Sequence, residues 1–99
     1  MVIRWTRESL ERLAEIEAYI SKDSPERAIK FENYLIDQAE PLKDHPKIGR
    51  LVPETGNENI REIIIKNYRI IYRISTHTVD IITVFEGHRL LLPEELETK

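Results

Sequence analysis

The segment from Ile60 to Glu86 constrains the fold most, because it concentrates β-branched residues: IREIIIKNYRIIYRISTHTVDIITVFE. Short runs of this composition, interrupted at Lys66-Asn67 and again at 76–78, are typical of strands joined by tight turns. We therefore predict three strands in a meander, at residues 60–65, 68–75 and 79–85.

The middle strand of this meander has two different faces, since successive side chains of a strand point to opposite sides. One side carries Tyr68, Ile70, Tyr72 and Ile74, and the other carries Arg69, Ile71, Arg73 and Ser75. We expect the first set to face a core and the second to face water, as in an antiparallel sheet that is covered on one side only.

Two amphipathic helices are predicted before the sheet. The first begins after Thr6 as its N-cap and ends near Ser21, and the second begins at Ser24-Pro25 and ends near Lys43. Apolar residues recur at helical spacing, namely Leu10, Leu13, Ile16 and Ile20 in the first helix and Ala28, Phe31, Leu35, Ala39 and Leu42 in the second.

The short connection between these helices predicts an antiparallel hairpin, which would pack on the Tyr68/Tyr72 face of the sheet. A short strand is expected at 2–5, and segment 45–59 is expected to be a loop, because it contains two Pro, two Gly and two Asn. The fold class is therefore α+β, in the order β-α-α-β-β-β, with residues 1–99 forming one domain.

Several classes of site are not expected from the composition. The absence of cysteine excludes a disulfide scaffold and a thiol nucleophile. His45, His77 and His88 fall in three separate turns without ligand spacing, so we expect no metal and no cofactor. The chain shows neither a signal peptide nor an apolar run close to the ~20 residues of a membrane span, so we expect a cytoplasmic protein without a membrane partner.

Charge is distributed unevenly along a chain whose net charge is −3. Residues 60–75 carry Arg61, Lys66, Arg69 and Arg73 against Glu62, which leaves this segment at +3 in an acidic protein. Such an island could bind a phosphate or an acidic partner. The alternative is that these are solvated strand charges, and for Arg61 an ion pair with a neighbouring Glu is the favoured interpretation.

The arginines are the candidate functional residues. Arg69 and Arg73 share one strand face, within ~7 Å of each other, and Arg89 follows the third strand. Converging guanidinium groups would bind a phosphodiester or an acidic protein surface. If the protein cleaved RNA, they would stabilise the charge that grows on the phosphate, and Glu86 and His88 would be the nearby candidates for general acid and base.

The ordered set of motifs resembles the ParE/RelE superfamily of toxins from type II toxin–antitoxin, or plasmid stabilisation, modules. The motifs are L-x-x-I-x-x-Y-I in the first helix, SPERA at the start of the second, HPKIGRLVPE before the sheet, IREIIIKNYRIIYRI in the sheet and VDIITVFEGHRLLLP at the end. The resemblance covers nearly the whole chain. It implies two antiparallel helices on a small, mostly antiparallel sheet.

The resemblance also implies a cognate antitoxin, encoded adjacently, which forms a hetero-oligomer with the toxin and blocks it. Leu90, Leu91 and Leu92, together with exposed helix surface, are the expected antitoxin contacts. ParE-like members inhibit DNA gyrase by protein–protein contact without catalytic residues, and the Y-R-I-I-Y-R-I and G-H-R-L-L forms of this chain are closer to that branch.

RelE-like members instead cut messenger RNA on the ribosome, and whether this chain is an enzyme depends on which branch it follows. Arg69 and Arg89 match the catalytic arginines of the RelE-like members, whereas no tyrosine follows Tyr72, where those members carry a C-terminal one. Arg61, Arg69, Arg73 and Arg89 are then the candidate phosphate or target contacts. A third interpretation is a degenerate, inactive toxin that only binds its antitoxin.

Overall fold

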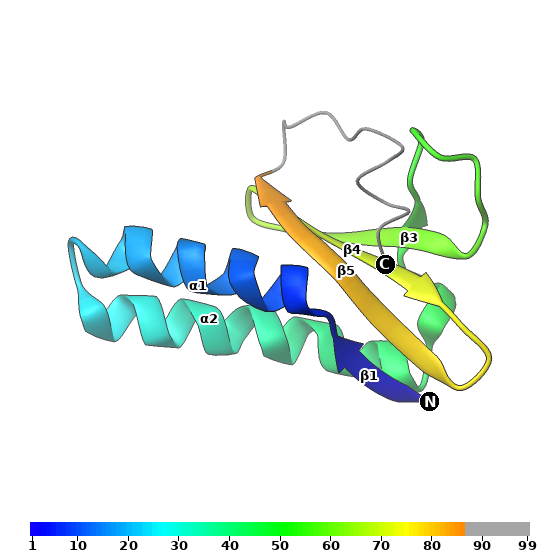
Figure 1. The fold of residues 1–99 in the computed structure, drawn as a ribbon, viewed down its shortest axis with the longest axis horizontal. Helices are drawn as coiled ribbons and strands as arrows, with labels where there is room; N and C mark the ends of the chain where they lie inside the picture. The colour runs from blue at the N-terminus through cyan, green and yellow to red at the C-terminus, as the bar shows by residue number, and fades with distance from the viewer. Residues whose placement is uncertain (87–99) are drawn as a thin grey trace.

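The computed structural model describes residues 1–86, in which two helices pack on one face of a five-stranded sheet (Figure 1). The elements in chain order are β1 Val2–Trp5, α1 Arg7–Ser21, α2 Pro25–Ala39, the 3-10 helices η1 Glu40–Lys43 and η2 Pro46–Ile48, β2 Arg50–Leu51, β3 Ile60–Ile65, β4 Tyr68–Ile74 and β5 Thr78–Glu86. The predicted α+β class is confirmed, and the predicted strands at 2–5 and 60–65 match β1 and β3. Strands β4 and β5 differ from their predicted bounds by one residue at one or both ends.

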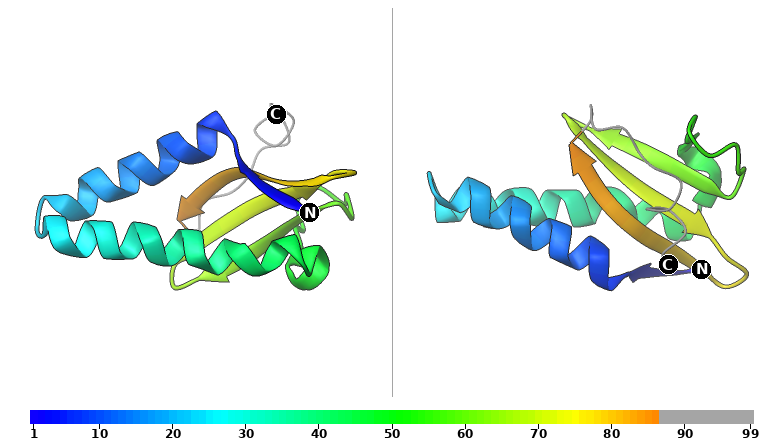
Figure 2. Two further views of the ribbon diagram at one scale, coloured as in Figure 1. Left: turned by 90° about the horizontal axis from the view of Figure 1, so that it is seen from below. Right: turned by 45° about the horizontal axis from the view of Figure 1, so that its top comes forward.

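The sheet has the strand order β1-β5-β4-β3-β2. The last three strands form the predicted antiparallel meander, and β1 joins it in parallel beside β5, with Val2 opposite Thr78 and Trp5 opposite Ile81. The first strand of the chain therefore lies beside the last described one (Figure 2). Strand β2, which we did not predict, adds two residues to the far edge beside Arg61 and Glu62.

Thr6 fixes where α1 begins, as predicted. Its hydroxyl accepts a hydrogen bond from the Ser9 N–H at 3.2 Å and donates to the Ile81 carbonyl at 2.7 Å. The same side chain thus caps the helix and attaches it to β5. A register shift in β5 adjoins this contact, where Ile81 pairs with Tyr72 and Thr83 with Ile71.

The apolar stripe of α1 was predicted one residue too wide. Leu13 is buried and Ile16 and Ile20 are half-buried, but Leu10 is 53% exposed and the buried residue one turn before Leu13 is Ser9. At 3.6 residues per turn, Leu10 lies about 90° around the helix from the centre of the other four. Leu10 therefore belongs to the surface.

Helix α2 begins at the predicted place and ends earlier than predicted. The Ser24 hydroxyl accepts from the Arg27 N–H, and Pro25 occupies the first turn. The α-helix ends at Ala39, and residues 40–43 continue as the 3-10 helix η1. Pro41 accounts for the change, because proline has no N–H and its ring clashes with the carbonyl group four residues earlier in an α-helix.

The main core lies between the helix hairpin and the sheet (Figure 2). Its buried members are Leu13, Leu35, Ala39, Leu42, Ile65, Ile70, Tyr72, Val79, Ile81 and Val84. These include Ile70 and Tyr72 of the predicted inward face of β4 and most of the stripe of α2, and the half-buried Tyr68 and Ile74 pack against them. The prediction that the hairpin covers the Tyr68/Tyr72 face is confirmed. The loop end of the hairpin reaches past the strands (Figure 1).

The opposite face of the sheet was predicted to face water, and this is wrong at its centre. Ile71 is fully buried there, in a second apolar cluster with Val52, Ile60, Ile82 and Phe85. Val52 comes from the segment predicted as a loop, which folds over this face. The outer face is therefore a small second core.

Candidate functional site

Arg69 lies on the outer face of β4 and is held by two carboxylates. Its Nε donates to Glu62 Oε1 at 2.5 Å, and its terminal nitrogens lie 3.3–3.4 Å from the two carboxylate oxygens of Glu54. Glu62 also forms an ion pair with Arg50 of β2. The Arg69 and Glu62 side chains are 7% and 0% exposed, so this is an interior ion-pair network.

The environment keeps Arg69 charged. Burial acts to lower its pKa, but the hydrogen bonds and charges of Glu62 and Glu54 outweigh burial, so the pKa of Arg69 is raised above its usual value. Its positive charge is already compensated by these two carboxylates. A phosphate group would have to displace them from a buried site, which is costly for the carboxylate left without a partner.

Arg73 shares the outer face with Arg69, as the spacing predicted. It lies opposite Ile60 on β3 and Asp80 on β5, and its side chain is half-buried. Within residues 1–86 its guanidinium has neither a hydrogen-bond nor an ion-pair partner. Arg73 is therefore the strand arginine best able to bind an external anion.

Arg61 does not join the other two arginines. It lies opposite Tyr72 in the register, which places it on the helix-facing side of the sheet. Its guanidinium donates to the carbonyl oxygens of Gly49 at 3.0 Å and Glu58 at 3.1 Å. The prediction that Arg61 forms an ion pair with a neighbouring Glu is wrong within residues 1–86. Backbone carbonyl oxygens accept its hydrogen bonds instead, and these bonds attach the segment before β3 to the sheet.

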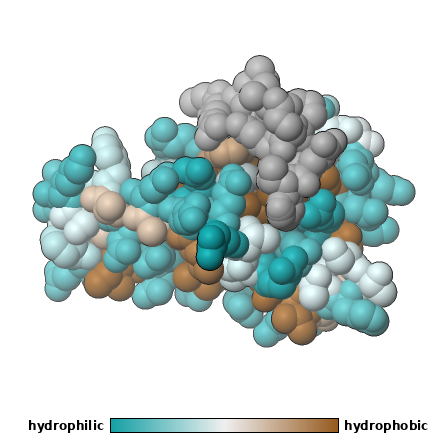
Figure 3. All heavy atoms as spheres, in the orientation of Figure 1, coloured by the Kyte–Doolittle hydropathy of each residue, from teal (hydrophilic) through white to brown (hydrophobic). Residues whose placement is uncertain are grey.

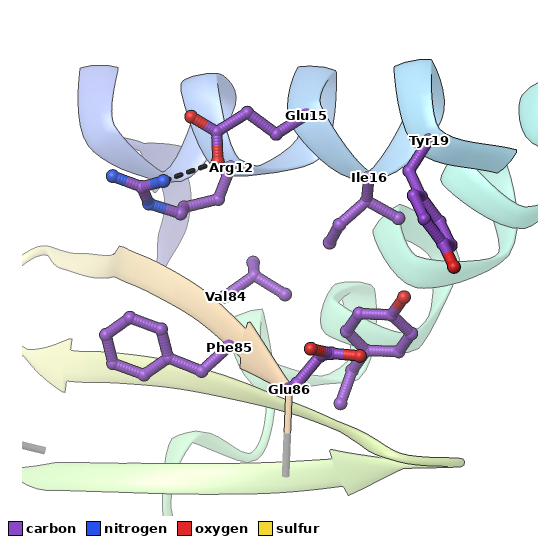
Figure 4. A pocket seen from close by; sticks show the side chains of 8 residues that line it. Arg12, Glu15, Ile16, Tyr19, Val84, Phe85 and Glu86 are labelled. Carbon is purple, nitrogen blue, oxygen red and sulfur yellow. Dashed lines mark hydrogen bonds and ion pairs between the residues drawn. The ribbon is translucent and has the colours of Figure 1, made fainter. Parts of the chain in front are cut away.

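Glu86, one of the two candidates for acid–base chemistry, also lies on the helix-facing side, opposite Tyr68. It lines a groove of about 380 Å³ between α1 and the end of β5 (Figure 4). Arg12 and Glu15 of α1 also line it, 2.5 Å apart as an ion pair. Burial, with the negative charge of Glu86, raises the pKa of the Tyr68 phenol. Glu86 and Arg69 thus point to opposite faces.

The remaining predicted site residues fall outside the described range. These are Arg89 and His88, together with Leu90, Leu91 and Leu92, the expected antitoxin contacts. Among residues 1–86, His45 and His77 are exposed, and no group of three potential metal-ligating side chains occurs. Over the same range, no helix is long and apolar enough to cross a membrane.

Sequence reasoning missed the two carboxylates that hold Arg69. From the sequence alone, Glu62 was counted only as part of the charge of its segment. Strand alternation places Glu62 on the same face of its strand as Ile64, and Ile64 pairs with Arg69 on the next strand, so Glu62 and Arg69 share a face. That signal was available in the sequence. Glu54 carried no such signal, because it comes from an irregular segment whose path over the sheet is not encoded in a local period.

Comparison with known proteins agrees with this fold. A family profile described as "ParE toxin of type II toxin-antitoxin system, parDE" matches residues 3–91. A protein of Sinorhizobium fredii (strain NBRC 101917 / NGR234), named "Putative toxin Y4kP", is 38% identical over 90 residues, which cover 88% of each chain. The structure is also similar to that of the chromosomal ParDE TA system from P. aeruginosa, with a TM-score of 0.72 and 21% identity, over 87% of this chain and 95% of the other.

The solved structure establishes the likeness of the fold, and the family profile establishes the likeness of the sequence from β1 to beyond β5. The superfamily resemblance of the sequence motifs is thereby confirmed. The chain belongs to the ParE toxin family of type II toxin–antitoxin systems.

Proposed function

We propose that this protein is a ParE-type toxin that inhibits DNA gyrase by protein–protein contact, and that an antitoxin encoded beside it neutralises it. Family membership supports a toxin, and the related P. aeruginosa structure is of a ParDE toxin–antitoxin system. Inhibition by contact needs no catalytic residue in the toxin. Gyrase acts on DNA in the cytoplasm, so the proposal also places the protein there.

One observation favours contact over catalysis. Arg69, the residue that corresponds to a catalytic arginine of RelE-like ribonucleases, is buried between Glu62 and Glu54. The charge of Arg69 in this setting is already paired. The alternative acid–base candidate Glu86 points to the other face of the sheet. The described residues thus give the ribonuclease alternative a poor phosphate site.

The proposal is tested with purified components. The wild-type protein should inhibit supercoiling by DNA gyrase and should leave ribosome-bound messenger RNA intact. The informative variant is Glu62→Met/Arg69→Met, because it removes the two buried members of the ion-pair network together, and their other partners, Glu54 and Arg50, are 20% and 60% exposed. We expect this double variant to inhibit gyrase as the wild type does.

Cleavage of messenger RNA on ribosomes by the wild-type protein, lost in the Glu62→Met/Arg69→Met variant, would contradict the proposal and would make Arg69 catalytic. A wild-type protein that does neither, yet binds its antitoxin, would identify the degenerate alternative. The fold of both proteins is checked by circular dichroism, so a loss of activity cannot be mistaken for unfolding.

A further inference from the structure

At one end of the sheet the helix hairpin reaches past the strands (Figure 1). A cationic groove lies between the hairpin and the turn that joins β3 and β4. It has a volume of about 540 Å³ and is lined by α1, α2 and the turn between β3 and β4. Its charged members are Arg27, Lys30 and Lys66. We call these three residues with the space between them the cationic groove.

The three cations have no carboxylate partner among residues 1–86. The ion pairs of this range lie elsewhere, on α1, on β1 with β5, at η1 and on the outer face of the sheet. The groove is thus a positive site on a protein whose net charge is −3. Its uncompensated charge is complementary to an anionic partner.

The floor of the groove is apolar and aromatic. Ile20 of α1 and Phe31 of α2 are half-buried there. The ring of Phe31 lies 6.3 Å from that of Tyr34 and 5.4 Å from that of Tyr68. Aromatic residues and arginine are enriched at protein–protein contacts relative to the rest of the surface, and the groove has both. A fitting ligand therefore combines negative charge with an apolar side chain.

Lys66 adds an independent observation. It is the first residue of the two-residue turn between β3 and β4, and its φ is +55°, a conformation that favours glycine. Its ammonium group lies 5.7 Å from the centre of the Tyr34 ring, at the wall of the groove. A lysine at a strained backbone position suggests a role for its side chain that outweighs the cost of the strain.

Single-stranded nucleic acid fits the groove less well than a peptide does. Nucleic-acid binding of this kind requires exposed ring faces for base stacking. Here the Phe31 ring packs against the rings of both Tyr34 and Tyr68, and the Lys66 ammonium group lies near the Tyr34 ring. Three cations also give only weak general affinity for phosphates. The occupant is better matched by carboxylates that flank an apolar anchor.

We propose that the cationic groove binds an acidic segment of the protein that the toxin inhibits, with carboxylates at Arg27, Lys30 and Lys66 and an apolar side chain against the floor that Ile20 and Phe31 form. This deepens the proposed function, on which it rests for the identity of the target. The groove is small, open and charged, which suits a transient contact with a target better than the large apolar interfaces of lasting complexes. An antitoxin is expected to form a lasting complex with a large apolar interface, which this groove does not provide.

The test compares two double charge reversals. Lys30→Glu/Lys66→Glu reverses the groove, and Arg7→Glu/Lys47→Glu makes the same change in net charge at two exposed side chains that do not line it. A third variant, Lys66→Gly, removes the lysine and relieves its backbone conformation. Each protein is assayed for growth arrest on induction, for rescue by the adjacent antitoxin gene, and for inhibition of purified DNA gyrase.

We expect the groove reversal to weaken growth arrest and to raise the concentration needed for half inhibition of gyrase by about tenfold or more, since opposed like charges disfavour the contact. The control reversal should stay within about twofold of the wild type, as expected for charges away from a contact. Lys66→Gly should be at least as heat-stable as the wild type and still lose potency, a combination that a merely structural lysine would not give.

Equal growth arrest by the groove reversal and its control would overturn the inference. So would unchanged arrest with loss of rescue, because the groove would then bind the antitoxin. Binding of a single-stranded DNA oligonucleotide that only the groove reversal abolishes would assign the groove to nucleic acid. If the wild-type protein leaves gyrase active but the groove reversal alone abolishes growth arrest, the groove still binds the target and the proposed gyrase function fails.

Discussion

Tyr72 connects the centre of the sheet to the segment that precedes β3. It is fully buried, and its hydroxyl accepts from the Gly49 N–H at 3.0 Å and donates to the Pro46 carbonyl at 2.6 Å. Arg61 donates to the Gly49 carbonyl from the other side. A Cβ on residue 49 would lie 2.4 Å from the Tyr72 hydroxyl and 2.7 Å from the Glu62 carbonyl oxygen. Only glycine fits here, because no side chain can enter this contact.

Replacing this glycine should therefore destabilise the fold. We expect Gly49→Ala to lower the free energy of unfolding by about 1–3 kcal/mol, as is typical of overpacking in a filled interior. Urea denaturation measures the change. Gly56→Asn is the matched control, since a Cβ on residue 56 would meet no atom within 4 Å and Asn tolerates its φ of +68°. A Gly49→Ala protein as stable as the wild type would contradict this account of the contact.

At the scale of the elements, β3 and β4 are joined on the outer face by the buried ion pair of Glu62 and Arg69. Removing one partner leaves a charge without compensation in the interior. Arg69→Met alone should lower the free energy of unfolding by about 3–5 kcal/mol, and Glu62→Met/Arg69→Met should be close to neutral. Chemical denaturation of the two variants distinguishes the cases, and a loss in the double variant as large as that in Arg69→Met would contradict the claim that the uncompensated Glu62 carboxylate causes the loss.

Strand β1 is attached to β5 through Asp80, which lies opposite Arg4. The two side chains are 2.9 Å apart, and the Asp80 side chain is 7% exposed. The hydrogen bond from Arg4 lowers the pKa of Asp80, burial opposes it, and Thr78 and Ser75 lower it further. The net direction is downward, so the folded protein favours the ionised carboxylate.

A depressed folded-state pKa has a definite consequence for pH. The stabilisation that ionised Asp80 provides is complete above the unfolded-state pKa, about 3.9 for Asp. This stabilisation is lost as the pH falls through the lower folded-state pKa. Asp80→Asn should therefore remove stability at neutral pH and flatten the decline in acid. Melting temperatures between neutral pH and acid check this, and parallel curves for the two proteins would contradict it.

The sequence predicted the elements better than it predicted the outer face of the sheet. Helix starts at Thr6 and Ser24, the hairpin turn at Lys66-Asn67 and the meander are local signals, and the structure confirms them. The burial of Ile71 and Arg69 depends on Val52 and Glu54. Val52 and Glu54 belong to the irregular segment between β2 and β3, which has no hydrophobic periodicity. The sequence of that segment therefore does not indicate that it folds over the sheet. Strand β2 is too short, at two residues, to leave a pattern.

The candidate site was predictable only in part, for the same reason. Strand alternation placed Arg69 and Arg73 on one face, and the register confirms it. Arg61 was listed with them as a target contact, but its separations from Arg69 and Arg73 are even, and across the two-residue turn at Lys66-Asn67 an even separation places side chains on opposite faces. The cationic groove was not foreseen, since it joins two helices and a turn that meet only in the folded chain.

At the scale of the whole molecule, the described residues form a scaffold with different surfaces on its sides. The helix hairpin covers one face of the sheet, and the segment after β2 covers part of the other (Figure 2). On the face shown in Figure 3, hydrophobic side chains form separate patches among hydrophilic ones. Exposed apolar residues include Leu10, Tyr19 and Ile29 on the helices. Dispersed apolar residues of this kind are usual on a protein surface.

The central claim, that the toxin acts on gyrase by contact and not on messenger RNA by cleavage, is tested most directly in cells. The protein is induced without its antitoxin in a bacterial host, and incorporation of labelled thymidine and leucine is followed over the first minutes. The account predicts that DNA synthesis falls first, with protein synthesis following later. An earlier fall in protein synthesis would contradict it and would favour the ribosome-dependent ribonuclease.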